Sequence, residues 1–428
     1  MSKSRFGPSV ALSLVVANMI GTGIFTSLGL QISEIKSGFV ILVLWALGGI
    51  IALTGALCYA EIALILKRSG GEYNYLSEIY HPIVGFISGF ISLVVGFAAP
   101  MAALGIAIGH YLMPITGAGN NFLIPFIALT LVTFVNLFGI KPTGLFQIFF
   151  TGLKIILLLA FCLIPLLSDV PLSGVSFIPR MEDFSEFLKP KFGVALVYVS
   201  YAFAGWNAST YIAGQLENPK KSIPFSLLLG TGIVTLLYLM LNFMFLNVAG
   251  FAELEGKIDI LNIVAAKIFG TNNVYLISGL VGLALLSSLN SLVIAGPRVL
   301  AVAGEDYSAI KFLSRKNKLD SPYISILIQY IIALILLYSW SFSFILKYIG
   351  ITLSLSSTLV VIGLFILRKR DVPRPFKTWG YPLTPITFII INSLMITYLS
   401  FNTPLVLIPS LGTIMLGGIL YFLVKKTT

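Results

Sequence analysis

The sequence predicts an all-α integral membrane protein of twelve transmembrane helices, ten of which form an inverted repeat of five plus five helices. Three observations lead to this prediction. Of 428 residues, 57% are hydrophobic and only 10% are charged, and the mean hydropathy is +1.00. A soluble domain of this length does not have such a composition. The chain also contains twelve long apolar stretches, two of which carry a glycine-containing interruption at corresponding positions.

The apolar stretches set the number of helices. A transmembrane helix needs about 20 residues to cross about 30 Å of hydrocarbon. The N-terminus carries Lys3 and Arg5 ahead of a long apolar stretch without a small-residue cleavage site, which predicts a first helix rather than a signal peptide. The predicted helices span residues 8–31, 38–66, 83–112, 121–139, 143–167, 192–213, 223–250, 274–303, 321–338, 341–367, 380–400 and 405–424.

The distribution of positive charge predicts the orientation. The formal net charge is +11, but Lys and Arg fall in short clusters between apolar stretches rather than on one basic face, which argues against a nucleic-acid partner. Most of them lie on one predicted side of the membrane, and an excess of Lys and Arg marks the cytoplasmic side. We therefore expect a multi-pass protein of the plasma (inner) membrane with both termini cytoplasmic, and the lipid bilayer as its surroundings.

The odd number of helices in each half makes the repeat inverted. Residues 1–167 hold the first five helices, residues 168–190 form an outer segment, and residues 191–370 hold the next five. Because five is odd, the second set must cross the membrane with the opposite polarity. Residues 371–428 add the last two helices.

Two of the predicted helices are interrupted at membrane depth. The first contains Gly21-Thr22-Gly23, and the sixth, which opens the second half, contains Ala204-Gly205-Trp206-Asn207. Irregular backbone is tolerated there only where it is buried in protein or lines a wet cavity. Paired interruptions in corresponding positions of two halves indicate the binding site of a transporter.

The freed backbone groups suggest a ligand. Amide N–H groups at the start of a half-helix attract an anion such as a carboxylate, and freed carbonyls near Met19, Ile20, Tyr201 and Ala204 accept from an ammonium. An α-amino acid carries both groups. The alternative is that Gly21 and Gly23 only permit close helix packing.

Four stretches in order along the chain carry a family resemblance. ANMIGTGIF (17–25) resembles the first-helix signature of the amino acid-polyamine-organocation superfamily. Three more are similar to segments of its L-type amino acid transporter family: YAEIALILKRSGGEYNYL (59–76), YAFAGWNASTYIAGQLENPKKSIP (201–224) and LRKRDVPRPFKTWGYP (367–382).

The resemblance implies a LeuT-type fold, with helices 1 and 6 unwound at the midplane, and sodium-independent transport of amino acids by alternating access, as exchange or coupled to protons. It also implies an aromatic gate at Tyr201 and a polar residue beside the break at Asn207. The substrate-binding residues expected on this basis are Met19, Ile20, Gly21, Thr22, Gly23, Tyr201, Phe203, Ala204, Gly205, Asn207 and Ser354.

Lys154 is predicted to lie near the middle of the fifth helix, where its side chain cannot easily reach either interface. An ionisable group at this depth is a functional hypothesis by default. The resemblance places it at the cation site of sodium-coupled relatives, with Ser287 and Ser288 as coupling neighbours. A proton-coupling lysine and a permanently charged structural brace are equal alternatives.

The expected pocket residues are neutral, and no core carboxylate is evident, which favours neutral L-amino acids over cationic ones. Ala99, Ala208 and Ser354 depart from common family residues, so the pocket should differ in shape. The outer loop MPITGAGNN (113–121) has no cysteine, so we expect no disulfide-linked accessory subunit. No cofactor is expected, and two isolated histidines predict no metal site.

Other classes of function remain in view. A membrane enzyme needs clustered His, Asp or Cys near one face, which the sequence lacks, so no enzyme activity is expected. A channel needs a symmetric pore-lining element. A transporter of cationic amino acids or amines on the same fold, or a non-transporting amino acid sensor, stays open.

Overall fold

The computed structural model describes residues 5–117, 122–167, 170–257, 259–339 and 342–426. These residues form helices joined by short connections, and their only β-pairing is an isolated bridge between Phe6 and Leu216. The α-helices are α1 (Pro8–Met19), α2 (Thr22–Ile32), α3 (Gly38–Leu66), α4 (Glu72–Ile79), α5 (Pro82–Ile91), α6 (Ala99–Thr116), α7 (Leu123–Leu137), α8 (Ile140–Leu167), α9 (Met181–Glu186), α10 (Pro190–Ala202), α11 (Pro219–Leu254), α12 (Ile260–Phe269), α13 (Val274–Asp306), α14 (Tyr323–Ser339), α15 (Phe342–Arg368), α16 (Leu383–Asn402) and α17 (Leu407–Lys426).

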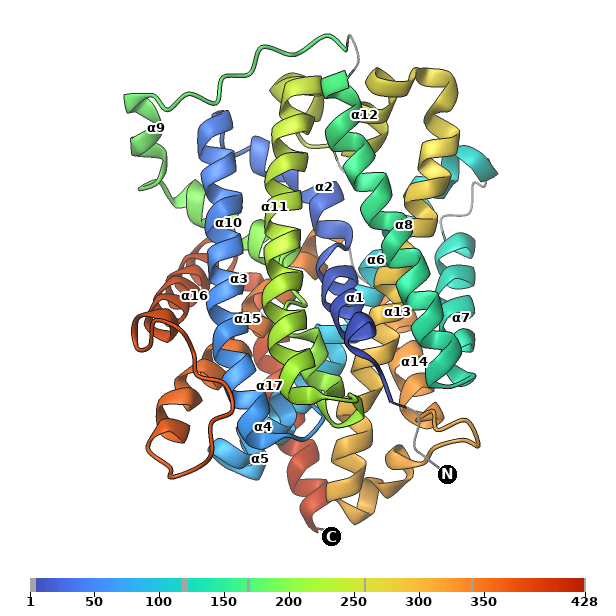
Figure 1. Cartoon of the computed structure of the whole chain (residues 1–428), viewed down its shortest axis with the longest axis vertical. Helices are drawn as coiled ribbons and strands as arrows, with labels where there is room; N and C mark the ends of the chain where they lie inside the picture. The colour runs from blue at the N-terminus through green and yellow to red at the C-terminus, as the bar shows by residue number, and fades with distance from the viewer. Residues whose placement is uncertain (1–4, 118–121, 168–169, 258, 340–341, 427–428) are drawn as a thin grey trace.

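The long helices run roughly side by side, with α1 and α2 near the centre of the bundle (Figure 1). Within the described residues, nine helical segments are long and apolar enough to cross a membrane. A π-helical turn, η1 (Ser92–Ala98), joins α5 to α6, so that these three form one such segment. Shorter apolar helices occur as well, among them α7, α10, α12 and α14. The chain is therefore a multi-pass membrane protein, whereas the count of twelve crossings stays a prediction.

The first interruption is shorter than expected. The helix stops at Met19 and starts again at Thr22, so that Ile20 and Gly21 alone leave the helical conformation. Thr22 and Gly23, which the sequence predicts to lie within the interruption, form the first turn of α2. A two-residue gap suffices because the end of α1 is held by side chains from other helices, as described below.

The second interruption is longer. Helix α10 ends at Ala202, a series of turns covers residues 203–207, and a 3₁₀-helix, η2 (Ala208–Gln215), follows. Gly205 has a φ of 96°, a left-handed conformation that glycine adopts at little cost. The interruption therefore lies where the sequence predicts it, and it starts one residue earlier, at Phe203.

The two interrupted helices pack closely against each other. A Cβ atom added to Gly23 would lie 2.4 Å from the backbone Cα atom of Ala202, and one added to Gly205 would lie 2.5 Å from the side-chain Nδ2 atom of Asn18. Neither distance leaves room for a methyl group unless a neighbour moves. Gly23 therefore permits close helix packing, and it also lies next to the interruption of the helix.

This close approach makes a prediction. Gly23→Ala should lower the free energy of unfolding by about 1–3 kcal/mol, the usual cost of overpacking, and reduce the melting temperature of the detergent-solubilised protein. Gly232→Ala is the matched control, because a Cβ atom at Gly232 in α11 would have no neighbour within 4 Å. Equal melting temperatures for the two variants would contradict the backbone contact.

Candidate functional site

A cavity of about 120 Å³ lies where the two interruptions meet. Segments from both interrupted helices line it together with α3, α4, α15, α16 and the segment from η1 to α6. Ten of the predicted binding residues line this cavity: Met19, Gly21, Thr22, Gly23, Tyr201, Phe203, Ala204, Gly205, Asn207 and Ser354. The eleventh, Ile20, is fully buried and does not line it.

One side of the cavity presents backbone donors. The first N–H groups of α2 have no partner within their helix and lie at the positive end of the helix dipole. The amide of Gly21 is used locally, because it donates to the carbonyl of Met19 at 2.8 Å. The Thr22 hydroxyl lies 2.7 Å from the Tyr201 hydroxyl. The amides of Thr22 and Gly23, with these two hydroxyls, therefore suit an anion.

Two of the predicted carbonyl acceptors are already occupied. The Met19 carbonyl accepts from the Tyr238 hydroxyl at 2.6 Å in addition to the amide just described. The Ile20 carbonyl accepts from Lys154 Nζ at 2.7 Å and from Ser288 Oγ at 2.6 Å. A carbonyl oxygen has two lone pairs, so neither group has capacity left for a ligand. This is a correction to the ammonium site expected at Met19 and Ile20.

The carbonyls of the second interruption have more capacity. The Tyr201 carbonyl accepts from the amide of Ala204 at 3.0 Å and from that of Phe203, so its lone pairs are used and it drops out of the expected ammonium site. Phe203 and Ala204 line the cavity, and no donor among the described residues bonds their carbonyl oxygens. The acceptor side of the cavity is therefore Phe203 and Ala204.

Tyr238 of α11 joins the two interrupted helices, a role that the sequence analysis missed. Its hydroxyl lies 2.6 Å from the Met19 carbonyl and 3.0 Å from the Ala202 carbonyl. These are the last residues of α1 and α10, where carbonyls have no partner within the helix. The two helix-end carbonyls thus share the one hydrogen of this hydroxyl, and the shorter contact is with Met19. A lone tyrosine in an apolar stretch gives no sequence signal for such a position.

Lys154 of α8 is fully buried. Its ammonium donates to the Ile20 carbonyl at 2.7 Å, to the Ala17 carbonyl at 3.5 Å and to the Ser288 hydroxyl. Two of the three acceptors belong to the C-terminal end of α1, where the helix dipole favours a cation. Ser288 is brought to Lys154 as predicted, whereas Ser287 donates to a carbonyl of its own helix.

The structure places a carboxylate in the cavity, against the expectation of neutral lining residues. Glu72, at the start of α4, lines the cavity and is 2% exposed. Its carboxylate accepts from Tyr59 at 2.7 Å, from Ser356 at 2.8 Å and from Asn207 at 3.4 Å. The sequence analysis missed it because α4 lies in a connection between two predicted helices, and only the tertiary fold directs this connection inward.

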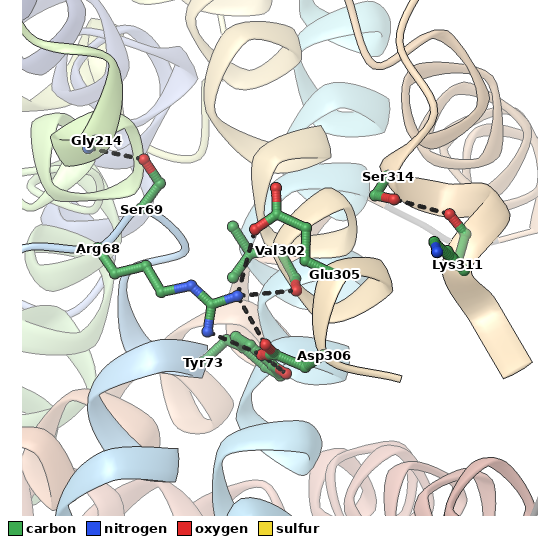
Figure 2. Close-up of polar contacts among 9 residues, drawn as sticks. All are labelled: Arg68, Ser69, Tyr73, Gly214, Val302, Glu305, Asp306, Lys311 and Ser314. Atoms are coloured by element: carbon green, nitrogen blue, oxygen red, sulfur yellow. Dashed lines mark hydrogen bonds and ion pairs between the residues drawn. The ribbon is translucent and has the colours of Figure 1, made fainter. Parts of the chain in front are cut away.

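An ion-pair cluster ties the α3–α4 connection to the end of α13 (Figure 2). The Arg68 guanidinium bonds Asp306 in a bidentate arrangement at 2.7 and 3.1 Å and reaches Glu305 at 3.3 Å. The Tyr73 hydroxyl donates to Asp306 at 2.6 Å. Burial and the neighbouring Asp306 carboxylate raise the pKa of Tyr73 above its usual range, so its hydroxyl stays protonated.

Further bonds close the same end of the molecule. The amide of Gly214 donates to the Ser69 hydroxyl at 2.9 Å (Figure 2). The amide of Phe6 donates to the Gln215 carbonyl at 2.8 Å, and Arg298 of α13 donates to the side chain of Gln215 at 3.2 Å. These bonds join the segment before α1, the end of η2, the α3–α4 connection and α13.

Comparison with known proteins agrees with this geometry. A model of the amino acid permease family matches residues 6–423. The chain belongs to this family. The predicted membership of the amino acid-polyamine-organocation superfamily is therefore confirmed.

Named relatives cover nearly the whole permease. It is 27% identical over 410 residues to the serine/threonine exchanger SteT of Bacillus subtilis, covering 92% of each chain. It is 26% identical over 438 residues to the large neutral amino acids transporter small subunit 2 of Mus musculus, covering 98% of this chain and 81% of the relative. It is 26% identical over 381 residues to the human cystine/glutamate transporter, covering 86% and 74%.

The position of Tyr238 makes a prediction. Tyr238→Phe keeps the ring but removes the hydroxyl that the Met19 and Ala202 carbonyls share, at a cost of about 1–3 kcal/mol. We expect a lower melting temperature and weaker amino acid binding in a ligand-induced thermal shift. Tyr275→Phe, on a side chain that is 57% exposed, is the control. Unchanged binding in Tyr238→Phe would contradict its role in holding the interruptions.

Proposed function

We propose that this permease is a secondary transporter that carries neutral L-amino acids across the plasma membrane by sodium-independent alternating access. One observation carries the proposal: the same cavity is lined by the free amides at the start of α2 and by the free carbonyls of Phe203 and Ala204. A zwitterionic α-amino acid matches both sides. The relatives named as amino acid transporters and exchangers support the same substrate class.

The cavity suggests how the substrate is held. The α-carboxylate would accept from the amides of Thr22 and Gly23, where the dipole of α2 adds to the attraction. The α-ammonium would donate to the carbonyls of Phe203 and Ala204. In the proposed complex the Tyr201 ring covers the substrate from one side. The side chain of the substrate lies toward Asn207 and Ser354.

We infer a LeuT-type arrangement of twelve crossings. Nine long helical segments together with the shorter helices α7, α10 and α14 give this count within the described residues. Helix α12 has ten residues, about 15 Å of rise, which is half of the hydrocarbon thickness. The start of α1 and the end of α17 lie at the same end of the molecule, consistent with two cytoplasmic termini (Figure 1).

We propose that Lys154 acts as a charged brace rather than as the proton carrier. Its ammonium has three N–H donors and three acceptors in place. Loss of its proton would leave two N–H donors for three acceptors and would remove the positive charge that the C-terminal end of α1 favours. A permanent ammonium at this position also takes the place that a sodium ion would need.

The outer loop supports a single-component transporter. Residues 113–121 contain no cysteine, and residues 118–121 of this loop lie outside the described part of the chain. Cys58 and Cys162 are both buried. We therefore expect no disulfide-linked accessory subunit.

Transport is tested in proteoliposomes without sodium. Uptake of labelled alanine should be seen with amino acid inside if the protein exchanges substrates, or into empty vesicles under a proton gradient if it is a symporter. Thr22→Trp should reduce uptake to background, because the side chain would fill the cavity. Retained uptake in Thr22→Trp would mean that the substrate binds elsewhere. Amino acid binding by the wild-type protein without any uptake would favour a sensor. Uptake of lysine instead of alanine would favour the cationic alternative.

The cluster around Arg68 makes a separate prediction. We propose that the cavity opens toward the termini by breaking the bonds between Arg68 and α13, each worth about 0.2–1 kcal/mol at partly exposed sites. Arg68→Ala should therefore raise the alkylation rate of a Ser357→Cys reporter in the cavity about two- to fivefold in inside-out vesicles. Lys369→Ala, which removes another charge at the end of α15, is the control. Equal rates would mean that the cluster does not hold the cavity closed.

A further inference from the structure

Glu72 is the one charged side chain among the described residues that line the cavity. No described lysine or arginine lies within 4.0 Å of its carboxylate. This sets it apart from Glu61, which is equally buried but pairs with Arg368 at 2.6 Å. A buried charge without a counterion is costly, and such a group tends to become neutral or to bind a cation.

The surroundings of Glu72 suit both charge states. The titratable groups that face it are the hydroxyls of Tyr59 from α3, Tyr75 from α4 and Tyr211 from η2. From α15 and the interruption after α10 it meets only Ser356 and Asn207. No cation among the described residues therefore competes for this carboxylate.

A chain of hydroxyls allows the proton to be accommodated. Ser356 donates to Glu72 at 2.8 Å and lies 2.7 Å from the hydroxyl of Ser88 on α5, where either oxygen can be the donor. When Glu72 is ionised, Ser356 donates to it. When Glu72 is protonated, its O–H donates to Ser356, which then donates to Ser88. The change needs only the rotation of hydroxyl hydrogens.

We propose that Glu72 is the proton-binding group of this transporter, and that its neutral acid form is the state in which the cavity accepts a neutral amino acid. This rests on the proposed function. The carboxylate takes one proton from the water of the cavity and returns it to water when the cavity opens on the other side. Burial raises the pKa of Glu72 above its ordinary value of 4.5.

A cation on the side chain of a substrate is the competing ligand for this carboxylate. Three of its roughly four lone pairs are already used by Tyr59, Asn207 and Ser356. A proton needs no additional space, because the O–H that it forms donates to Ser356, whereas an ammonium needs space within a cavity of about 120 Å³ that must also hold the rest of the amino acid. The geometry favours the proton.

The first test does not depend on transport. A carboxyl group whose pKa is higher in the folded than in the unfolded state stabilises the protein less as the pH rises from 4.5 through the raised value. The melting temperature of the wild-type protein should fall across this window, and the slope should be smaller in Glu72→Gln. Glu78→Gln, which removes an exposed carboxyl from the same helix, should keep the wild-type slope. A wild-type slope in Glu72→Gln would overturn the proposal.

The second test measures uptake of labelled alanine at several pH values. Wild-type uptake should rise as the pH falls, whereas uptake by Glu72→Gln should not depend on pH. Ser356→Ala, which leaves the carboxyl in place, should move the wild-type midpoint to higher pH, because the hydrogen bond that the ionised form loses is charge-assisted and stronger than the neutral bond that the acid form loses. An unshifted midpoint in Ser356→Ala, or a retained pH profile in Glu72→Gln, would overturn the proposal.

Two further outcomes separate the hypotheses. Competition by ornithine that is present in the wild type and lost in Glu72→Gln would assign the carboxylate to the substrate's side chain and overturn the proton role. If no variant transports any amino acid but the pH slope of the melting temperature is reduced in Glu72→Gln, the proposed function fails and the proton site stands.

Discussion

The structure depends on how the end of α1 is satisfied in the middle of the bundle. A helix that stops at membrane depth leaves carbonyls without partners, and no water is available there to bond them. Lys154 and Ser288 bond the Ile20 carbonyl, and Tyr238 bonds that of Met19. Three different helices therefore supply donors to one helix end. Because these bonds are made, the chain can turn at Ile20 and Gly21 and present the amides of α2 to a cavity.

The same constraint explains the glycines. The interrupted helices approach closely, and the amides of one and the carbonyls of the other line the same cavity. A side chain at Gly23 would meet the backbone of Ala202, and one at Gly205 would meet the side chain of Asn18. The Tyr238 hydroxyl bonds the carbonyls at the C-terminal ends of α1 and α10, those of Met19 and Ala202. Packing and ligand binding are thus served by the same residues.

Two buried ionisable groups near the cavity differ in how they are compensated. The Lys154 ammonium has an acceptor for each N–H and lies at the negative end of a helix dipole. The Glu72 carboxylate is surrounded by neutral donors and has no counterion among the described residues. A charged group with partners for all its hydrogen-bonding atoms tends to keep its protonation state. A buried charge without a counterion gains or loses a proton more readily. The two groups are therefore suited to different tasks, bracing and proton binding, and only Glu72 lines the cavity that substrate enters.

The sequence by itself determined the membrane class, both helix interruptions and ten of the residues that line the cavity, because apolar length and paired glycines are local signals. It also indicated the pairing of Lys154 with Ser288. Only the tertiary structure decided which carbonyls are free, since Met19 and Ile20 lose their capacity to Tyr238, Lys154 and Ser288 from distant helices. It likewise brought Glu72 from a connecting segment into the cavity. Hydrogen-bond occupancy and the direction of a connection depend on contacts between residues far apart in the chain, and no local pattern records them.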